Sequence, residues 1–539
     1  MKKIDDEIQL LLKEHNGNIR EILEENSRLD YLYALSEQRE LLLEWYDFDP
    51  EGELLQIGAD YGAMTGLFRT SVAQVTVLDE DANALRTVEL RYPGAANIRY
   101  ENGSLFDLKE ERAEGFDYVV FAGTLQAPYE EQLQAAKALL KPDGVLIVAV
   151  PNALGMKYFS GTADEANAMT KVQLAQLLPG GRFYYPMPDY RTPVSIYSDQ
   201  YLPKKGDMTR VTPAYDYPRY HMMDMGQKFD TACEAGLFDL YANSYLVFWS
   251  SSPERLENGE DPIYVKYNKT RKEVFQIKTC ICEAKKEGGR RRYVEKAALS
   301  LAGSAHIDSF RKKEEELMQQ HRVLKVASPE YRPDRNSAFF PYLEGQTWAE
   351  KLGQQISGGQ LPLEALSQAL DQVYDIRPEF RSSFVRTEEF DEVFGEGLCE
   401  EELALLGQDT ACRVSNIDAL FENMLLTEDG IYCLDYEWVF LFPVPEHFVK
   451  YRILYYFYEQ YSSVMKQLSL DQILSAFGIT PEMAAVYRKM EVNFQNYVHG
   501  ENQQLYLGNY MVYSRGVKEI RQTESDLARA RERIEQMKI

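Results

Sequence analysis

The sequence predicts an α/β protein with two domains, a doubly wound parallel sheet followed by a two-lobed α+β fold, and a helical tail. Three observations lead to this fold class. Apolar strand-like runs alternate with helical patterns over residues 51–255. A β-rich stretch and then an α-rich stretch occupy residues 260–515. A short heptad pattern ends the chain.

The bulk properties narrow the class of protein. A chain of 539 residues exceeds one hydrophobic core and predicts two or three domains. The formal charge of −26 argues against a nucleic-acid partner, because phosphate binding needs clustered Lys and Arg. The six Cys form no disulfide framework, which favours a reducing cytoplasm. We expect no signal peptide and no transmembrane segment, and at most peripheral attachment to a membrane through partners.

The first domain is expected to begin with N-terminal helices over residues 1–50, broken at Asn16–Asn18. Apolar runs rich in Val, Ile and Leu then predict strands at 54–58, 75–79, 118–123 and 144–151, and two closing strands at 182–188 and 244–251. A helical pattern fills 128–140. The Tyr- and Pro-rich stretch near 189–225 is too long for a turn and predicts a lid or a substrate loop.

The linker-like composition of residues 251–262 separates the domains. Three strand-like runs follow at 263–269, 274–284 and 291–299, then a helix near 305–320 and mainly helical segments at 361–405 and 443–515. This order suits two lobes with a site in the cleft between them. We therefore expect domains at 51–255 and 260–515 and a tail at 516–539.

The tail has a heptad pattern. Ile520, Leu527 and Ile534 share one position, and Thr523, Ala530 and Met537 lie three residues further on. Such a stripe predicts a coiled coil. The pattern is still running at Ile539, so we expect either a longer tail or an end that binds a partner.

A glycine-rich turn follows the first predicted strand. Gly58, Asp60 and Gly62 form G-x-D-x-G, and Asp79 ends the second strand. Glycines let the backbone approach a ligand closely, and an acid at the second strand can bind both ribose hydroxyls. This arrangement resembles the class I (Rossmann-like) methyltransferases, and the resemblance implies S-adenosylmethionine as cofactor. A nicotinamide dinucleotide fold would need G-x-G-x-x-G, which is not present here.

Two more segments extend this resemblance. Residues 101–108 fall where the family binds adenine, which assigns Ser104 and Leu105 to the cofactor, and 139–152 resemble its helix, turn and fifth strand. Gln56 stands where the family usually has an acid, and Asp60 where it often has glycine. The cofactor-binding residues implied are Gln56, Gly58, Asp60, Gly62, Asp79, Ser104 and Leu105. Tyr33 and Arg39 could reach the methionine carboxylate or be packing residues, and no base for methyl transfer is assigned.

The second domain has the residues that phosphoryl transfer requires. Asp418 precedes Asn423 by five residues, and Asp435 follows an apolar strand. In kinases this spacing gives a base for the acceptor hydroxyl and two metal ligands. Lys296 is the expected phosphate-binding lysine, with Lys266 as its rival. Glu314, Glu315 and Glu316 are candidate partners for that lysine.

The segment 339–352 resembles the hinge of aminoglycoside and choline kinases. ATP and Mg²⁺ are the ligands that this resemblance implies. However, Asn416 stands where the family usually has His, and 267–275 contains no glycine to cover phosphates. An active kinase and a non-catalytic kinase fold therefore both remain open.

The whole chain resembles the bacterial bifunctional methyltransferase–kinase proteins of surface-polysaccharide synthesis, of the O-antigen chain-capping type. The segments that carry this resemblance are 58–66, 152–161, 183–203, 415–423 and 434–440. It implies a glycan or lipid-linked glycan substrate, a homo-oligomer, and polysaccharide-synthesis enzymes as partners of the coiled coil. The alternatives are a methyltransferase for an unrelated small molecule or protein, and a non-catalytic scaffold.

Overall fold

The structure is a computed structural model. It describes residues 2–111, 115–208, 220–221, 223, 225–257, 261–286, 289–332, 336–465, 468–503, 505–506, 515–516 and 520–536. The chain forms two compact units. Unit 1 consists of Met1–Tyr267 and Gln504–Ile539, and unit 2 of Asn268–Gln503.

Unit 1 contains a sheet in the order β3-β2-β1-β4-β5-β9-β6-β7-β10. Its first five strands are parallel: β1 (Glu53–Ile57), β2 (Gln74–Asp79), β3 (Ile98–Asn102), β4 (Phe116–Ala122) and β5 (Leu140–Pro151). The other four are antiparallel to their neighbours: β6 (Arg182–Met187), β7 (Ser195–Ser198), β9 (Ser244–Trp249) and β10 (Pro262–Tyr267). The order reverses between β1 and β4, where ligands bind in such sheets.

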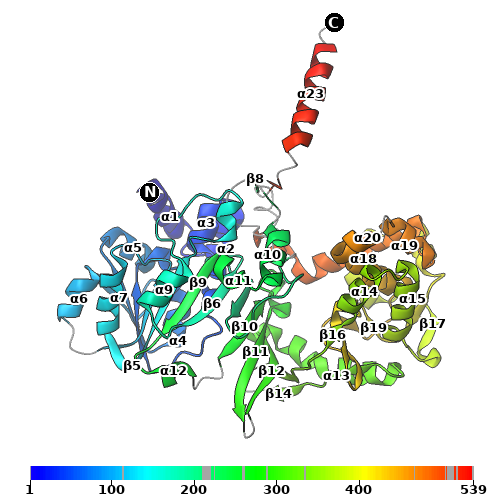
Figure 1. Cartoon of the computed structure of the whole chain (residues 1–539), viewed down its shortest axis with the longest axis horizontal. Helices are drawn as coiled ribbons and strands as arrows, with labels where there is room; N and C mark the ends of the chain where they lie inside the picture. The colour runs from blue at the N-terminus through cyan, green and yellow to red at the C-terminus, as the bar shows by residue number, and fades with distance from the viewer. Residues whose placement is uncertain are drawn as a thin grey trace. The chain divides into compact units, whose positions relative to one another are not determined.

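The central strands form because their side chains are apolar on both faces and are buried by helices. Figure 1 shows helices beside this sheet. The helices after the first strand are α4 (Thr65–Ser71), α5 (Ala82–Arg91), α6 (Leu105–Glu111), α7 (Tyr129–Ala138), α8 (Met156–Phe159), α9 (Lys171–Leu177), α10 (Met225–Glu234), α11 (Phe238–Tyr241) and α12 (Pro253–Glu257). The predicted alternation of strands and helices is confirmed.

The N-terminal segment folds into α1 (Lys2–Glu14), α2 (Ile19–Glu25), α3 (Leu29–Leu35) and the 3-10 turn η1 (Glu37–Leu42). The break predicted at residues 16–18 is confirmed, with positive φ at Asn16 and Gly17. These helices share a core that includes Leu505 and Tyr506. A second link joins β8 (Tyr220–His221) to β23 (Arg515–Gly516). The chain therefore returns to unit 1 after unit 2.

Unit 2 begins with an antiparallel sheet of β11 (Ile277–Lys286), β12 (Gly289–Ala298), β15 (Ser337–Pro341) and β14 (Glu330–Arg332). Helix α13 (Ser304–Gln320) contacts it. A small sheet follows in the order β13-β21-β20-β16, made of Lys325–Val326, Gly430–Cys433, Met424–Thr427 and Gln346–Thr347. Further strand pairs are β17 (Arg381–Ser383) with β18 (Thr410–Cys412), and β19 (Ser415–Asn416) with β22 (Val439–Phe440).

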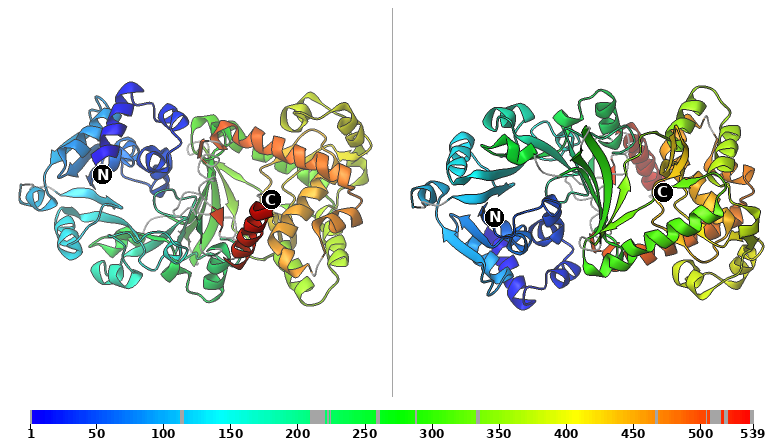
Figure 2. Two further views of the ribbon diagram at one scale, coloured as in Figure 1. Left: turned by 90° about the horizontal axis from the view of Figure 1, so that it is seen from above. Right: turned by 90° about the horizontal axis from the view of Figure 1, so that it is seen from below.

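The rest of unit 2 is mainly helical, as predicted. Its helices are α14 (Trp348–Ser357), α15 (Pro362–Val373), α16 (Glu388–Phe390), α17 (Glu400–Leu406), α18 (Glu446–Tyr461), α19 (Leu470–Ala476), α20 (Pro481–His499) and α21 (Glu501–Gln503). Figure 2 shows the long orange helix α20 lengthwise in its left view. One hydrophobic core contains residues of α13, of the sheet strands and of all these helices except α21.

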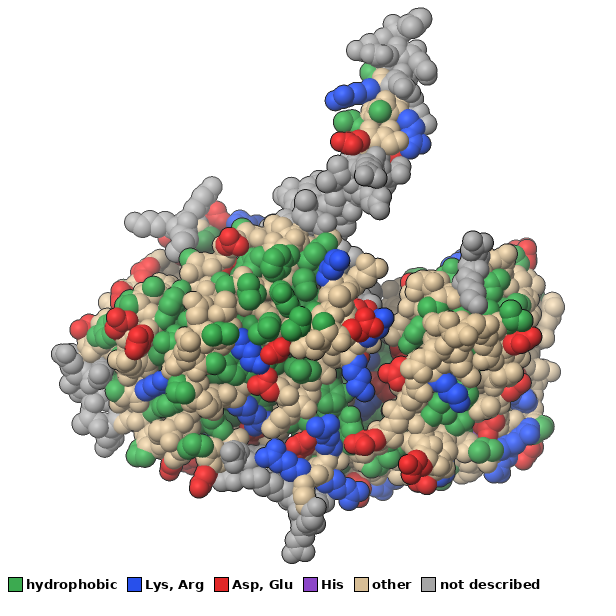
Figure 3. Space-filling model, viewed as in Figure 1, with side chains coloured by type: hydrophobic (Ala, Val, Ile, Leu, Met, Phe, Trp, Pro, Cys, Tyr) green, Lys and Arg blue, Asp and Glu red, His purple; other side chains and the backbone are tan. Residues whose placement is uncertain are grey.

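The tail contains one helix, α23 (Ile520–Gln536), so the predicted helix is confirmed. Leu527 and Ile534 on it are each 52% exposed, and hydrophobic side chains are visible on this helix in Figure 3. The coiled coil stays a prediction. Among the described residues, no helix is long and apolar enough to cross a bilayer.

Candidate functional site

The turn after β1 depends on two glycines. Gly58 has a φ of +85° and Gly62 a φ of +72°, which L side chains rarely adopt. A Cβ added at Gly58 would lie 2.6 Å from Cγ2 of Thr124, and the Thr124 hydroxyl donates to the carbonyl of Ile57. The backbone at the end of β1 therefore packs directly against the Thr124 side chain, which follows β4. Such close packing is expected of a tight ligand-binding turn.

Gln56 supports this turn from inside the sheet. Its side chain is buried, and its amide nitrogen donates to the carbonyls of Gly58 at 3.0 Å and Ala59 at 3.3 Å. Its amide oxygen accepts from the Thr65 hydroxyl at 2.8 Å. A carboxylate could not donate these bonds. The departure from the usual acid thus has a structural reason.

Asp79 joins the ends of β1 and β2. Its carboxylate accepts from the backbone N–H of Ala59 at 2.8 Å and of Asp81 at 2.9 Å. Asn102, at the end of β3, donates to the Asp79 carbonyl at 3.0 Å. The structure therefore brings the predicted acid to the glycine turn.

Ser104 and Leu105 begin α6 next to this acid. The Ser104 hydroxyl donates to the Asp107 carboxylate at 2.7 Å and accepts from the Asp107 N–H at 3.2 Å, while Leu105 is buried. Such reciprocal bonds fix the start of a helix. The preceding Gly103 N–H donates to the Asp79 carbonyl at 3.1 Å, which links this segment to β2.

Arg39 lies against the third position of the motif. Its side chain is buried and pairs with the Asp60 carboxylate at 2.6 Å, and it also donates to the Tyr33 carbonyl at 2.7 Å. Among the described residues, its Nε has no hydrogen-bond partner. The Arg39 guanidinium, with its Nε free to donate, suits the carboxylate of an amino acid, and the adjacent Asp60 carboxylate suits its ammonium group. The turn, Asp79 and this pair together fit S-adenosylmethionine.

A buried charge network, not predicted from the sequence, follows β5 and β6. Lys157, fully buried on α8, bonds Glu165 at 2.7 Å and Asp189 at 2.6 Å. Arg191 pairs with Glu165 and approaches Asp189. Although burial alone would raise it, Lys157 and Arg191 lower the pKa of Asp189. We call these four residues the acidic–basic network.

Tyr190, which lies between Asp189 and Arg191 in the sequence, links the network to the end of β4. The Tyr190 ring packs on Gly123 at the end of β4, where an added Cβ would lie 2.5 Å from it. The Arg191 guanidinium stands 4.8 Å from the Tyr190 ring centre and 5.7 Å from that of Tyr33. In contrast, Asn152 donates to the Leu240 and Ala242 carbonyls and is a structural brace.

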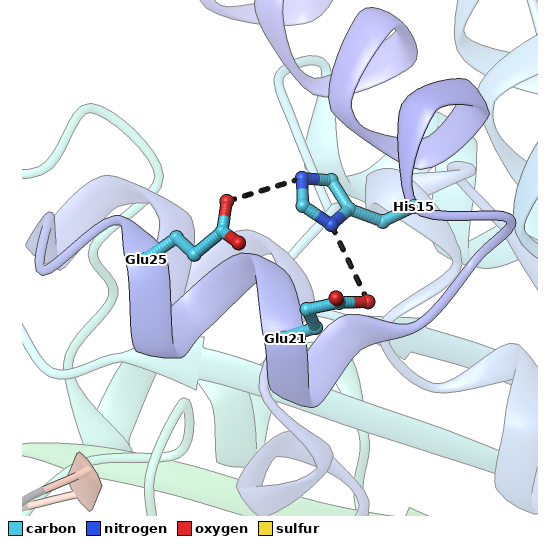
Figure 4. Close-up of side chains that lie close together, drawn as sticks. All are labelled: His15, Glu21 and Glu25. Atoms are coloured by element: carbon cyan, nitrogen blue, oxygen red, sulfur yellow. Dashed lines mark ion pairs between the residues drawn. The ribbon is translucent and has the colours of Figure 1, made fainter.

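One cluster in unit 1 has side chains of the kind that bind metals. His15, Glu21 and Glu25 lie together in Figure 4. The two ring nitrogens of His15 face different carboxylates, Nδ1 toward Glu21 and Nε2 toward Glu25, each at 3.5 Å. The ring therefore bridges two glutamates of α2 and ties that helix to the end of α1.

In unit 2 the predicted residues also come together. Lys296 on β12 is buried and pairs with Asp435 at 2.8 Å. Asn423 donates to the Asp418 carbonyl at 2.9 Å, and its own carbonyl accepts from the N–H of Leu434, next to Asp435. Burial raises the pKa of Asp418 to about 7, although Arg452 opposes this shift.

The rival and the partners proposed for Lys296 lie elsewhere. Lys266 is exposed on β10 of unit 1. Glu314 bonds the Ser328 hydroxyl, and Glu316 pairs with Arg413 at 2.5 Å. Lys296 is thus held by Asp435 and not by a glutamate of α13.

Glu437, two residues after Asp435, is a buried junction that the sequence did not reveal. Its carboxylate accepts from Arg271 and contacts Nε2 of His306 at 2.7 Å. Its carbonyl accepts from the Lys313 ammonium at 2.6 Å. His306 and Lys313 both belong to α13, so Glu437 fixes this helix to the segment that contains Asp435.

Comparison with known proteins identifies the class of the first unit. Residues 55–148 match the family model described as a methyltransferase domain. No curated protein matches the chain. The solved structures similar to it include precorrin 8w decarboxylase of Methanobacterium thermoautotrophicum, with 22% identity over 21% of this chain and 62% of that chain and a TM-score of 0.20.

Two other solved structures are N-methyltransferase NodS of Bradyrhizobium japonicum with S-adenosylhomocysteine, and a putative methyltransferase of Bacillus halodurans. NodS has 20% identity over 25% of this chain and 74% of its own, with a TM-score of 0.21. The Bacillus protein has 14% identity over 39% and 96%, with a TM-score of 0.25.

The sheet order, the glycine turn and the family match over residues 55–148 define a Rossmann-like methyltransferase domain. Unit 1 thus contains an S-adenosylmethionine-dependent methyltransferase domain, and S-adenosylmethionine is its cofactor.

Proposed function

We propose that the protein methylates a glycan or phosphoglycan, and that unit 2 is a kinase-like domain that phosphorylates the same substrate with Mg-ATP. The observation that supports this proposal best is that each unit has its own candidate ligand-binding site. Asp79 meets the glycine turn in unit 1, and Lys296 meets Asp435 in unit 2. The order of the motifs matches the polysaccharide-capping proteins.

In the methyltransferase site, Asp79 would bind the ribose, and Ser104 with Leu105 would border the adenine. Gly58, Asp60 and Gly62 would pass along the amino-acid part, with Arg39 beside its carboxylate. Gln56 would act through the turn that it holds. S-Adenosylmethionine supplies an activated methyl group, so the protein has mainly to hold and orient the acceptor.

The acidic–basic network favours an acceptor site at the ends of β4, β5 and β6. It holds in place the segments after β5 and β6, both of which belong to the resemblance with the capping proteins. Burying four charged side chains carries a large desolvation penalty, which their pairing offsets only in part. A need to orient an acceptor precisely beside the cofactor explains why charged residues, and not apolar ones, hold these two loops.

In unit 2, Asp435 and Asn423 would hold Mg²⁺, Lys296 would contact phosphate, and Asp418 would accept the proton of the attacking hydroxyl. The donor set fits: carboxylate and amide oxygens suit Mg²⁺, and a buried ammonium suits phosphate. Lys296 is bonded to Asp435, so it would have to exchange that carboxylate for phosphate on binding.

Isothermal titration with S-adenosylhomocysteine tests the first site. Asp79→Ala should weaken binding at least tenfold, because the ribose loses a charged acceptor worth about 1.5–3 kcal/mol. The neighbouring exposed Glu80→Ala is the matched control and should bind as wild type. Equal affinity of the Asp79 variant would remove Asp79 from the site.

Thermal unfolding with Mg-ATP tests the second site. Asp435→Ala should abolish the Mg-ATP-induced rise in melting temperature, because the metal loses its carboxylate ligand. The exposed Glu428→Ala is the control. An unchanged shift in the Asp435 variant would contradict metal binding there.

Radiolabelled methyl transfer tests the substrate class. With S-adenosylmethionine and cell envelope extracts, label should enter the glycan fraction, and Mg-ATP should increase it. Label in the protein or small-molecule fraction would favour the alternative acceptors. Cofactor binding without any transfer would favour a scaffold.

A further inference from the structure

We infer that Lys313 on α13 is a second anion-binding cation of unit 2, which contacts a phosphate-bearing ligand beside Lys296 and Asp435. This goes beyond the proposed function, in which Lys296 alone meets phosphate. It rests on the proposed location of the site, but the ligand class follows from the charges around Lys313.

The position of Lys313 is set by two contacts. Its ammonium donates to the Glu437 carbonyl at 2.6 Å and lies 5.6 Å from the centre of the Phe310 ring. The Lys296 ammonium lies 5.5 Å from the centre of the same ring. Both ammonium groups therefore adjoin one aromatic side chain, next to the segment that contains Asp435.

Lys313 differs from the other cations of this region in its partners. Lys296 pairs with Asp435, while Arg271 and His306 share the Glu437 carboxylate. Within the part of unit 2 that the structure describes, no carboxylate oxygen lies within 4.0 Å of the Lys313 ammonium. Burial lowers the pKa of Lys313 to about 8, although Glu437 and Asp418 oppose the shift.

A partly buried ammonium bonded to a neutral carbonyl is stabilised by an added anion. A role confined to docking α13 would need a hydrogen-bond donor but no charge, and glutamine would suffice. In protein kinases the corresponding helix supplies a glutamate to the strand lysine. Here the acids next to Lys313 bond Ser328 and Arg413, and the side chain of α13 that bonds the segment after Asp435 is a lysine. The sign of the charge thus favours a phosphate.

The test compares binding of sodium tripolyphosphate and of Mg-ATP by isothermal titration to the full chain. Lys313→Gln keeps a donor for the Glu437 carbonyl but removes the charge. It should weaken tripolyphosphate binding about tenfold or more, the loss expected for a charge-assisted hydrogen bond. Lys313→Arg should stay within a few-fold of wild type. The exposed neighbour Lys312→Gln is the matched control and should bind as wild type.

A measurement on the unmodified protein keeps the test decisive if a variant unfolds. Tripolyphosphate should protect Lys313 from acetylation by acetic anhydride, as read by peptide mass mapping, and should leave Lys312 reactive. Unchanged affinity in folded Lys313→Gln, no binding of tripolyphosphate by wild type, or no protection would each overturn the inference. Binding of tripolyphosphate through Lys313 without binding of Mg-ATP would sustain it and contradict the kinase proposal.

Discussion

At the scale of the residue, Gly58 combines two separate constraints on one position. Its φ is +85°, and Thr124 occupies the space that a side chain would need. Gly94 also has a positive φ, of +72°, but nothing lies within 4 Å of its added Cβ. A comparison of the two glycines therefore separates the effect of backbone strain from that of steric crowding by Thr124.

We expect Gly94→Ala to lower the free energy of unfolding by about 1–2 kcal/mol, the cost of a left-handed L-residue. Gly58→Ala should lower it by about 2–5 kcal/mol, because overpacking adds to that strain. It should also weaken S-adenosylhomocysteine binding, whereas Gly94→Ala should not. Urea unfolding and titration measure both effects. Equal losses in the two variants would show that crowding at Thr124 is relieved.

Some of the site residues could be predicted from the sequence, and others could not. The meeting of Asp79 with the glycine turn followed from spacing along a recognisable pattern. For Lys296 the sequence predicted a glutamate of α13 as the partner, and the structure pairs it with Asp435 instead. The hydrogen bonds of Gln56 depend on backbone carbonyls that exist in this orientation only once the turn has formed. The position of Lys313 depends on how α13 packs, which no local pattern encodes.

At the scale of the element, the acidic–basic network connects the segments after β5 and β6. Burial alone would raise the pKa of both Glu165 and Asp189, but the nearby cations lower both pKa values instead. A carboxyl group whose pKa is lowered on folding stabilises the protein above its unfolded pKa, near 4. That contribution is lost as pH falls through the folded pKa.

Asp189→Asn should therefore lower the free energy of unfolding of unit 1 by about 3–5 kcal/mol at pH 7, since it leaves Lys157 buried with one partner fewer. The difference from wild type should shrink below pH 4. Glu234→Gln, which removes an exposed pair with Lys205, should cost less than about 1 kcal/mol. Urea unfolding at pH 7 and pH 3.5 checks both. A difference independent of pH would exclude an electrostatic origin.

Elements were easier to predict than their connections. The strands of unit 1 contain continuous apolar runs, because both faces of the sheet are buried. Such runs can be recognised in a sequence without knowledge of the fold. The small sheet of unit 2 was not predicted, since β13 and β16 have two residues each and no period to detect. The network pairs residues up to 32 positions apart, so its pairs arise only from the tertiary fold.

At the scale of the whole molecule, unit 1 is built from two stretches of chain. Leu505 and Tyr506 are buried among residues of α1, α2 and α3. This return was not predicted, because residues 443–515 were expected to be mainly helical and to belong to the second domain. The contacts of Leu505 and Tyr506 are with the N-terminal helices, far earlier in the chain, so no local sequence pattern predicts them.

Tyr506→Ala should destabilise unit 1 by about 3–5 kcal/mol, as truncation of a buried aromatic side chain does. Calorimetry should show the transition stabilised by S-adenosylhomocysteine moving to lower temperature, with the other transition unchanged. Leu527→Ala, on the exposed face of α23, should move neither. A shift confined to the second transition would assign Tyr506 to unit 2.

The return of residues 505 and 506 also has a consequence for synthesis. The N-terminal helices leave the ribosome long before the two side chains that complete their core. At roughly 5–20 residues per second, about 25–100 s separate α3 from Tyr506. During that interval the apolar surface of these helices stays open on the nascent chain, and unit 2 is translated in full. Completion of the N-terminal core of unit 1 thus waits until residues 505 and 506, which follow unit 2, have been translated.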